Sequence, residues 1–225
     1  GMDIISTSNI PWASILSLLA VITMTLGNLV ALQQNNIKRM LAYSSVAHAG
    51  YMLLAMPVMS SESIYAIMIY LVMYLFMNLG AFFIVILVKN KTGGETFDDY
   101  KGLGWEMPTV GICMTIFMVS LTGLPPTAGF IGKFYIFASL IKGGGSFYWL
   151  VFAGAINSVI SLYYYLKVVK VMFLDGDRKD VVLHPEFPMF AMLMITVIPS
   201  IILGIYWSPL AAWVRSSLVF YIQTI

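Results

Sequence analysis

The chain has 225 residues, of which 60% are apolar and only 10% are charged, and its mean hydropathy is +0.90. A soluble domain has about 45–50% apolar and about 25% charged residues, so this composition indicates an integral membrane protein. The formal net charge of +2 excludes the basic surface typical of nucleic-acid-binding proteins, and no nucleic-acid partner is expected. The one cysteine, Cys113, lies in an apolar run and indicates no disulfide within the chain.

Continuous apolar runs, rather than alternating ones, predict α-helical membrane crossings and not barrel strands. The first ten residues, GMDIISTSNI, have no basic stretch, so a signal peptide is not expected. Six crossings are predicted, at residues 11–32, 39–57, 64–88, 107–141, 147–173 and 187–207. The tail that follows, LAAWVRSSLVFYIQTI, is apolar with one arginine and is expected to form an interfacial helix.

The fourth predicted crossing is too long for one straight helix. Its 35 residues would extend about 50 Å, whereas the hydrocarbon core is about 30 Å thick. It contains the string GLPPTAGFIGKFYIF. Pro125 and Pro126 remove two backbone donors, and Gly123 and Gly129 permit sharp turns, so these four residues predict a hinge. The segment is therefore either one interrupted span or two full spans.

The distribution of lysine and arginine distinguishes these two topologies. One interrupted span places nine cations on one side and two on the other, whereas two full spans give seven against four. The positive-inside rule favours the interrupted span. Both termini are then expected on the outer side, with the long loops in the cytoplasm or its organellar equivalent. The nine cations on the loop side are Lys38, Arg39, Lys89, Lys91, Lys101, Lys167, Lys170, Arg178 and Lys179.

Lys133 lies four residues after Gly129, within the interrupted segment. Backbone groups freed by the break would cost several kcal/mol each in lipid, so the break is expected to be buried in protein or to line a wet cavity. An intramembrane lysine indicates function, and one between a dry environment and a helix end can gain and lose a proton. The alternatives are a plain proline kink and a static counter-ion, although no acidic residue of the sequence lies deep in a predicted span.

His48 lies near the middle of the second predicted crossing. Ser44, Ser45 and Tyr51 share its helix face, which makes a polar stripe on an apolar helix. Histidine is the residue best suited to proton relay near neutral pH. A neutral, hydrogen-bonded packing histidine explains the same pattern equally well.

Other polar residues of the predicted crossings are weaker candidates for a proton pathway. These are Lys38, Ser45, Tyr51, Asn78, Asn157 and Tyr164. Interhelical hydrogen bonding is the ordinary role of such side chains, and Lys38 fits a topology-fixing basic residue. The sequence contains no metal-ligand spacing, phosphate loop, dinucleotide fingerprint or nucleophile–base pair, so no metal, cofactor or catalytic residue is expected.

Several strings together resemble the antiporter-like membrane subunits of respiratory complex I. They are GNLVALQQNNIKRMLAYSSVAHAGYMLLA, YLFMNLGAFFIVI, FDDYKGLGWEMP, SLTGLPPTAGFIGKFYIF and NSVISLYYYLKVV. Within that group the resemblance is to the subunit N family of bacterial NADH–quinone oxidoreductase. The related Mrp-type sodium/proton antiporter subunits share KRMLAYSS, but the continuation HAGY and the string GFIGKFY fit the complex I family better.

The resemblance implies an all-α fold of two five-helix units in inverted topology, each with a broken helix, followed by a final helix. This chain resembles the second unit, at 1–174 with its broken helix at 107–141, plus a loop, final crossing and tail at 175–225. Lys133 matches the membrane lysine of the second broken helix, which takes part in proton transfer, and His48 matches a position on the polar axis. The glutamate–lysine pair and the other central lysine of such subunits belong to the first unit, which is absent here.

The expected function is therefore that of a proton-translocating membrane-arm subunit, or part of one, in an NADH–quinone oxidoreductase of the bacterial inner membrane. Electron transfer would occur elsewhere, and this chain would hold no redox centre. The alternatives are an Mrp-type sodium/proton antiporter subunit and a structural membrane scaffold. Expected partners are the missing N-terminal five-helix half, neighbouring antiporter-like subunits, other membrane subunits and the lipid bilayer.

Overall fold

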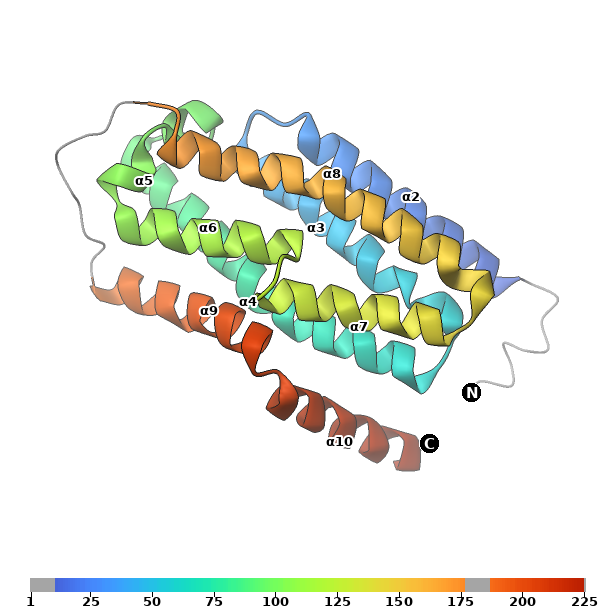
Figure 1. Cartoon of the computed structure of the whole chain (residues 1–225). Coiled ribbons are helices and arrows are strands. Elements are labelled where there is room, and N and C mark those ends of the chain that lie inside the picture. The colour runs from blue at the N-terminus through green and yellow to red at the C-terminus, as the bar shows by residue number, and fades with distance from the viewer. Residues whose placement is uncertain (1–10, 177–186, 225) are drawn as a thin grey trace.

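The computed structural model describes residues 11–176 and 187–224, and it is helical throughout that part (Figure 1). The longer helices are α2 Trp12–Leu32, α3 Ile37–Leu54, α4 Ser61–Thr92, α6 Pro108–Thr122, α7 Ala128–Lys142, α8 Tyr148–Phe173, α9 Phe187–Ile205 and α10 Ser208–Thr224. Short turns of helix are η1 Met56–Val58, η2 Phe97–Tyr100, α5 Leu103–Glu106 and η3 Gly145–Phe147. The all-α prediction is confirmed for the described residues. The expectation for residues 1–10 and the loop cations Arg178 and Lys179 lie outside them.

Four described helices are long and apolar enough to cross a membrane: Trp12–Leu32, Ser61–Thr92, Gly145–Phe173 and Phe187–Ile205. The number rises to five if Phe97–Glu106 and Pro108–Thr122, which meet at 119°, are counted as one span. The predicted second crossing, α3, does not meet this criterion because a polar stripe interrupts its apolar surface. Helices α6 and α7 have 15 residues each, too few to span a bilayer alone.

The predicted interruption is present at residues 123–127, between α6 and α7. The two helices run in the same direction, one after the other, as Figure 1 shows. Gly123 ends α6 with φ of +87°, a left-handed conformation that favours glycine. Its N–H donates to the carbonyl of Val119 at 3.1 Å, and the Leu124 N–H donates to the same carbonyl at 3.2 Å. The tight turn therefore satisfies part of the backbone that the break frees.

Leu124, Pro125 and Pro126 are exposed on the surface of this chain. The break is therefore not fully buried within this chain, although Gly204 of α9 packs directly against the Pro126 carbonyl. The expectation that the break is buried in protein or lines a wet cavity stays a prediction. Thr127 and Ala128, which begin the second half-helix, are buried. The break thus extends from the interior, where it meets polar side chains, to an open face.

Helix α3 lies at the centre of the bundle and packs against α2, α4, α7 and α8. Its closest neighbour is α2, because Gly50 lets the two backbones approach: a Cβ added there would lie 2.6 Å from the backbone nitrogen of Met24. This position places the polar face of α3 in the interior. Residues His48, Ser44 and Tyr51 are all at most 2% exposed.

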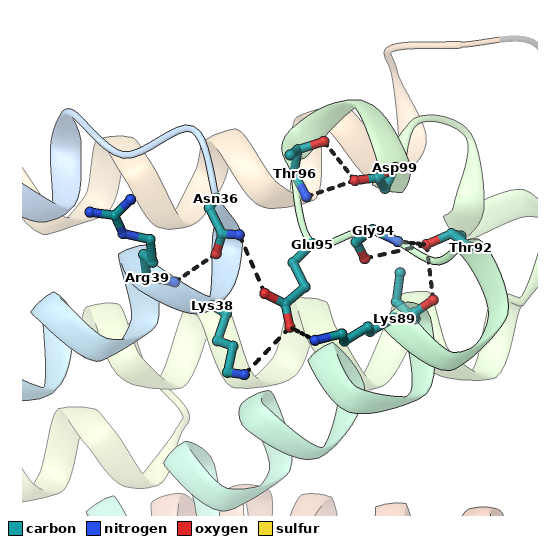
Figure 2. A network of polar contacts seen from close by, with 10 residues as sticks. Asn36, Lys38, Arg39, Lys89, Thr92, Gly94, Glu95, Thr96 and Asp99 are labelled. Atoms are coloured by element: carbon teal, nitrogen blue, oxygen red, sulfur yellow. Dashed lines mark hydrogen bonds and ion pairs between the residues drawn. The ribbon is translucent and has the colours of Figure 1, made fainter.

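The α2–α3 turn and the segment that follows α4 lie together at one end of the molecule. The backbone N–H of Ile37 donates to the carbonyl of Glu95 at 2.8 Å, and the N–H of Phe97 donates to that of Asn35 at 3.2 Å. In Figure 2 the Glu95 carboxylate lies between Lys89, at 3.0 Å, and Lys38, at 3.4 Å. The hydrogen bond from Lys89 holds the pKa of the Glu95 carboxyl below its usual value. This Glu95 cluster joins the start of α3 to the end of α4.

Candidate functional site

Lys133 lies in the second turn of α7, and its side chain extends back across the break. The residue is 5% exposed. Its Nζ donates to the carbonyl of Thr122 at 2.8 Å and to the hydroxyl of Ser158 at 3.1 Å. The Thr122 carbonyl is one of the groups that the end of α6 leaves without an intrahelical partner. A Cβ at Gly123 would lie 2.8 Å from Cδ of Lys133, so this glycine provides the space for the lysine stem.

The partners of the Lys133 amine are neutral. Besides the carbonyl and the hydroxyl, Nζ lies 4.4 Å from the centre of the Tyr51 ring. Lys133 takes part in none of the ion pairs within residues 11–176 and 187–224. The amine is therefore buried without a carboxylate from the described residues.

A cleft of about 300 Å³ reaches Lys133 from the face between α7 and α8. Thr122, Lys133 and Ser158 line its inner part. Phe134 and Val159 lie at its outer part and are 56% and 69% exposed. The amine is thus shielded by this chain on one side and meets an opening on the other.

His48 connects two tyrosines in the middle of the bundle. Its Nδ1 lies 2.6 Å from the hydroxyl of Tyr70 on α4, and its Nε2 lies 3.0 Å from the hydroxyl of Tyr165 on α8. A neutral imidazole accepts at one nitrogen and donates at the other. Moving a proton across the ring would exchange these two roles, so the arrangement suits a relay as well as a packing contact.

Tyr51 lies between His48 and the lysine. Its hydroxyl is 3.0 Å from Ser158 Oγ, the same atom that accepts from Lys133, and it donates to the Gly154 carbonyl at 3.2 Å. The rings of His48 and Tyr51 have centroids 6.0 Å apart. Lys133, Ser158 and Tyr51 therefore form one continuous hydrogen-bonded group, and His48 with its two tyrosines forms a second group beside it.

A third polar group joins α2 to α8. Asn28 Nδ2 donates to Oδ1 of Asn157 at 2.9 Å, and the Tyr164 hydroxyl donates to Oδ1 of Asn28 at 2.8 Å. The Tyr164 ring lies 4.5 Å from that of Tyr165, which brings this group beside the histidine group. Tyr164 and Asn157, two of the weaker candidates, are thus together in the interior.

The remaining weaker candidates lie nearer the Glu95 cluster. Ser45 Oγ is 3.5 Å from Oδ1 of Asn78, at the limit of a hydrogen bond, and it also donates to the Leu41 carbonyl at 3.1 Å. Lys38 belongs to the Glu95 cluster, with an ammonium group that is about half exposed. The structure therefore separates Lys38 from the interior groups.

Sequence reasoning missed Tyr70 and Asn28, and it did not single out Tyr165 or Ser158. A signal existed for α8, because Ser158 and Tyr165 are seven residues apart and share one helix face. A weaker signal existed for α4, where Tyr70, Tyr74 and Asn78 recur every four residues. Asn28 had none, because a lone asparagine in an apolar run does not reveal its distant partner.

Within the described residues, no cluster of three or more histidine, cysteine, aspartate or glutamate side chains could hold a metal ion. The buried groups are instead amine, imidazole, phenol, hydroxyl and amide. These groups can pass protons between hydrogen-bonded neighbours.

Comparison with known proteins places this site in a family. The family model described as "NADH:quinone oxidoreductase/Mrp antiporter, TM" matches residues 2–161. "NADH-quinone oxidoreductase subunit N 2" of Sorangium cellulosum is 50% identical over 211 residues, which are 92% of this chain and 41% of that protein. This chain spans about two fifths of the length of the curated relatives that it matches.

Solved structures show the same fold. A chain of respiratory complex I from Thermus thermophilus with bound aureothin has 31% identity and a TM-score of 0.74, over 88% of this chain and 45% of that one. A chain of the Mrp complex from Dietzia sp. DQ12-45-1b has a TM-score of 0.81 at 17% identity, over 92% of this chain and 47% of that one. The sequence match and the shared fold lead to one conclusion: this chain belongs to the NADH:quinone oxidoreductase/Mrp antiporter membrane family.

Proposed function

We propose that this chain is the second five-helix repeat, at 1–174, and the final helix and tail, at 175–225, of a proton-translocating membrane-arm subunit of an NADH–quinone oxidoreductase. The observation that carries the proposal is the Lys133 amine, buried at a helix break among neutral acceptors. Such an amine can change its charge without leaving a buried carboxylate unpaired. The interrupted α6–α7 segment then makes one crossing, and α3 makes another, which gives six crossings in all.

In this proposal the proton reaches Lys133 through the interior polar groups. His48 accepts a proton at the ring nitrogen that faces one tyrosine and releases a proton from the ring nitrogen that faces the other. Tyr51 and Ser158 then connect this part of the interior to the Lys133 amine. A water molecule or a ring rotation bridges the space between His48 and Tyr51, since their hydrogen-bonded groups are adjacent but separate. Loss of the proton toward one face follows when the charge of a neighbouring unit changes.

The proposed partners are inferred from the surface of the helix break that this chain leaves exposed. Leu124, Pro125 and Pro126 are exposed on the surface of this chain, and non-helical backbone at membrane depth is tolerated where it is buried in protein or lines a wet cavity. The relatives are more than twice as long as this chain. A further protein segment, either the N-terminal five-helix half or a neighbouring antiporter-like subunit, would cover that face. The proposed location is the bacterial inner membrane, with both termini outside and the basic loop end in the cytoplasm.

The test replaces Lys133 in the assembled complex and measures proton uptake by inverted membrane vesicles alongside NADH oxidation. Lys133→Met removes the proton-carrying group at similar length, and Lys133→Arg keeps the charge but does not release it. Both variants are expected to lower proton transport by about 10²–10⁴-fold, the contribution of a positioned group that transfers protons. Lys170→Met is the matched control, because Lys170 is an exposed lysine paired with Asp175.

Two results would contradict the proposal. Unchanged transport in Lys133→Met, with the complex intact on native gels, would support the structural scaffold. Transport that depends on sodium rather than on protons would support the Mrp-type antiporter.

A further inference from the structure

A second pocket, of about 280 Å³, lies at the end of the molecule opposite the Glu95 cluster, between α4, α7 and α10. Its charged residues are Glu62, Lys142 and Arg215. The Glu62 carboxylate lies 3.5 Å from Lys142 Nζ and 3.9 Å from Arg215 Nη2, and all three side chains are at least half exposed. One carboxylate is therefore shared by two cations, and the three charged side chains of the pocket together carry a net positive charge.

The apolar side of this pocket is a row on α7. Phe134, Ala138 and Lys142 follow at four-residue spacing and so lie on one helix face. Phe134 is 56% exposed, and it separates this pocket from the cleft that reaches Lys133. Over eight residues the row extends about 12 Å from the cation into the apolar part of the molecule.

Aromatic residues indicate that the charged end of the row lies at a membrane boundary. Tyr148 and Trp149 begin α8 just after the end of α7. Their exposed fractions are 55% and 51%. Exposed tyrosine and tryptophan at helix ends are typical of the headgroup level of a bilayer.

We propose that this pocket binds an anionic phospholipid, with the phosphate between Lys142 and Arg215 and an acyl chain along Ala138 and Phe134. The excess positive charge at the boundary matches one phosphate, and the apolar row matches a hydrocarbon chain. A transmembrane helix is a poorer match. Close helix packing needs several small residues on the contact face, whereas here the bulky Phe134 and Tyr135 line the pocket beside Ala138 and Ser139.

The test measures binding of phosphatidylglycerol to the intact complex in nanodiscs, by native mass spectrometry after stepwise delipidation. Lys142→Gln and Arg215→Gln are each expected to weaken retention about fivefold, the contribution of one cation near an anionic headgroup. Ala138→Trp fills the hollow and is expected to remove retention at this site. Lys170→Gln, which removes an exposed lysine at the opposite end, is expected to leave it unchanged.

A second arm identifies the occupant directly. Phosphatidylglycerol with a photoreactive group in mid-chain is expected to label the α7 peptide that contains Phe134, and excess inorganic phosphate is expected not to prevent this. Labelling that inorganic phosphate abolishes, or retention that is equal in all variants, would overturn the proposal. An Ala138→Cys variant that cross-links to another subunit would overturn it in favour of a protein occupant. None of these results depends on proton transport, so they are independent of the proposed function.

Discussion

Lysine side chains in this chain have two different kinds of partner. At the Glu95 end, Lys38 and Lys89 share one carboxylate, and Lys91 pairs with Glu106. In the interior, Lys133 meets a carbonyl, a hydroxyl and an aromatic ring. Both environments stabilise an ammonium group by hydrogen bonding, but only the first supplies a full negative charge.

This difference bears on the proposed function, in which the interior lysine changes its charge. A carboxylate beside an ammonium group favours the charged form. Neutral acceptors stabilise the ammonium form less, and burial opposes it. The proposed function requires Lys133 to exist in both forms during turnover, which a permanent carboxylate neighbour would prevent.

The largest expected effect comes from giving Lys133 the kind of partner that the surface lysines have. Ser158→Asp replaces the hydroxyl that lies 3.1 Å from Nζ by a carboxylate. The resulting buried ion pair should hold the amine charged and lower proton transport at least tenfold. Ser158→Ala is the control, because it removes the hydroxyl without adding a charge, and a loss of only a few-fold is expected. Normal transport in vesicles carrying Ser158→Asp would show that the charge of Lys133 need not change.

The next largest effect is expected at His48, where two substitutions distinguish a proton-relay role from a packing role. His48→Phe leaves the hydroxyls of Tyr70 and Tyr165 without their shared partner, and should cost about 1–3 kcal/mol of stability. His48→Gln keeps a donor and an acceptor but cannot titrate. Thermal denaturation of the complex should show that glutamine restores most of the stability, while vesicle assays should show that transport stays low. Full recovery of both would identify a packing histidine.

Much of the fold could be predicted from the sequence because the signals are local. The hinge at Gly123, Pro125, Pro126 and Gly129 was predicted from residue types that disfavour a continuous helix. The structure has an interruption at residues 123–127, whereas Gly129 already belongs to α7. The position of Lys133 at the start of the second half-helix followed from the same pattern. The exposure of the break could not be predicted, because it depends on which segments pack against it.

The partners of the site residues were harder to predict because they are distant in the sequence. His48 meets Tyr70, 22 residues away, and Tyr165, 117 residues away. A polar stripe on one helix shows that something polar faces it, but not which helix supplies the partner. The topology-fixing role of Lys38 stays a prediction, and its partner Glu95 was missed because its loop has no regular periodicity.

The smallest expected effect lies at the Glu95 cluster, where the charges are paired and exposed. The pKa of Glu95 is lowered in the folded chain, so its stabilising contribution is fully present above the unfolded value of about 4.3 and is lost as the pH falls from there through the lowered folded value. Glu95→Gln removes this contribution. The difference in thermal stability between the wild type and this variant should therefore be constant near neutral pH, shrink in acid and also shrink at high salt. Proton transport should be unchanged. A difference that grows in acid, or a loss of transport as large as that of Lys133→Met, would show that this carboxylate does more than anchor the start of α3.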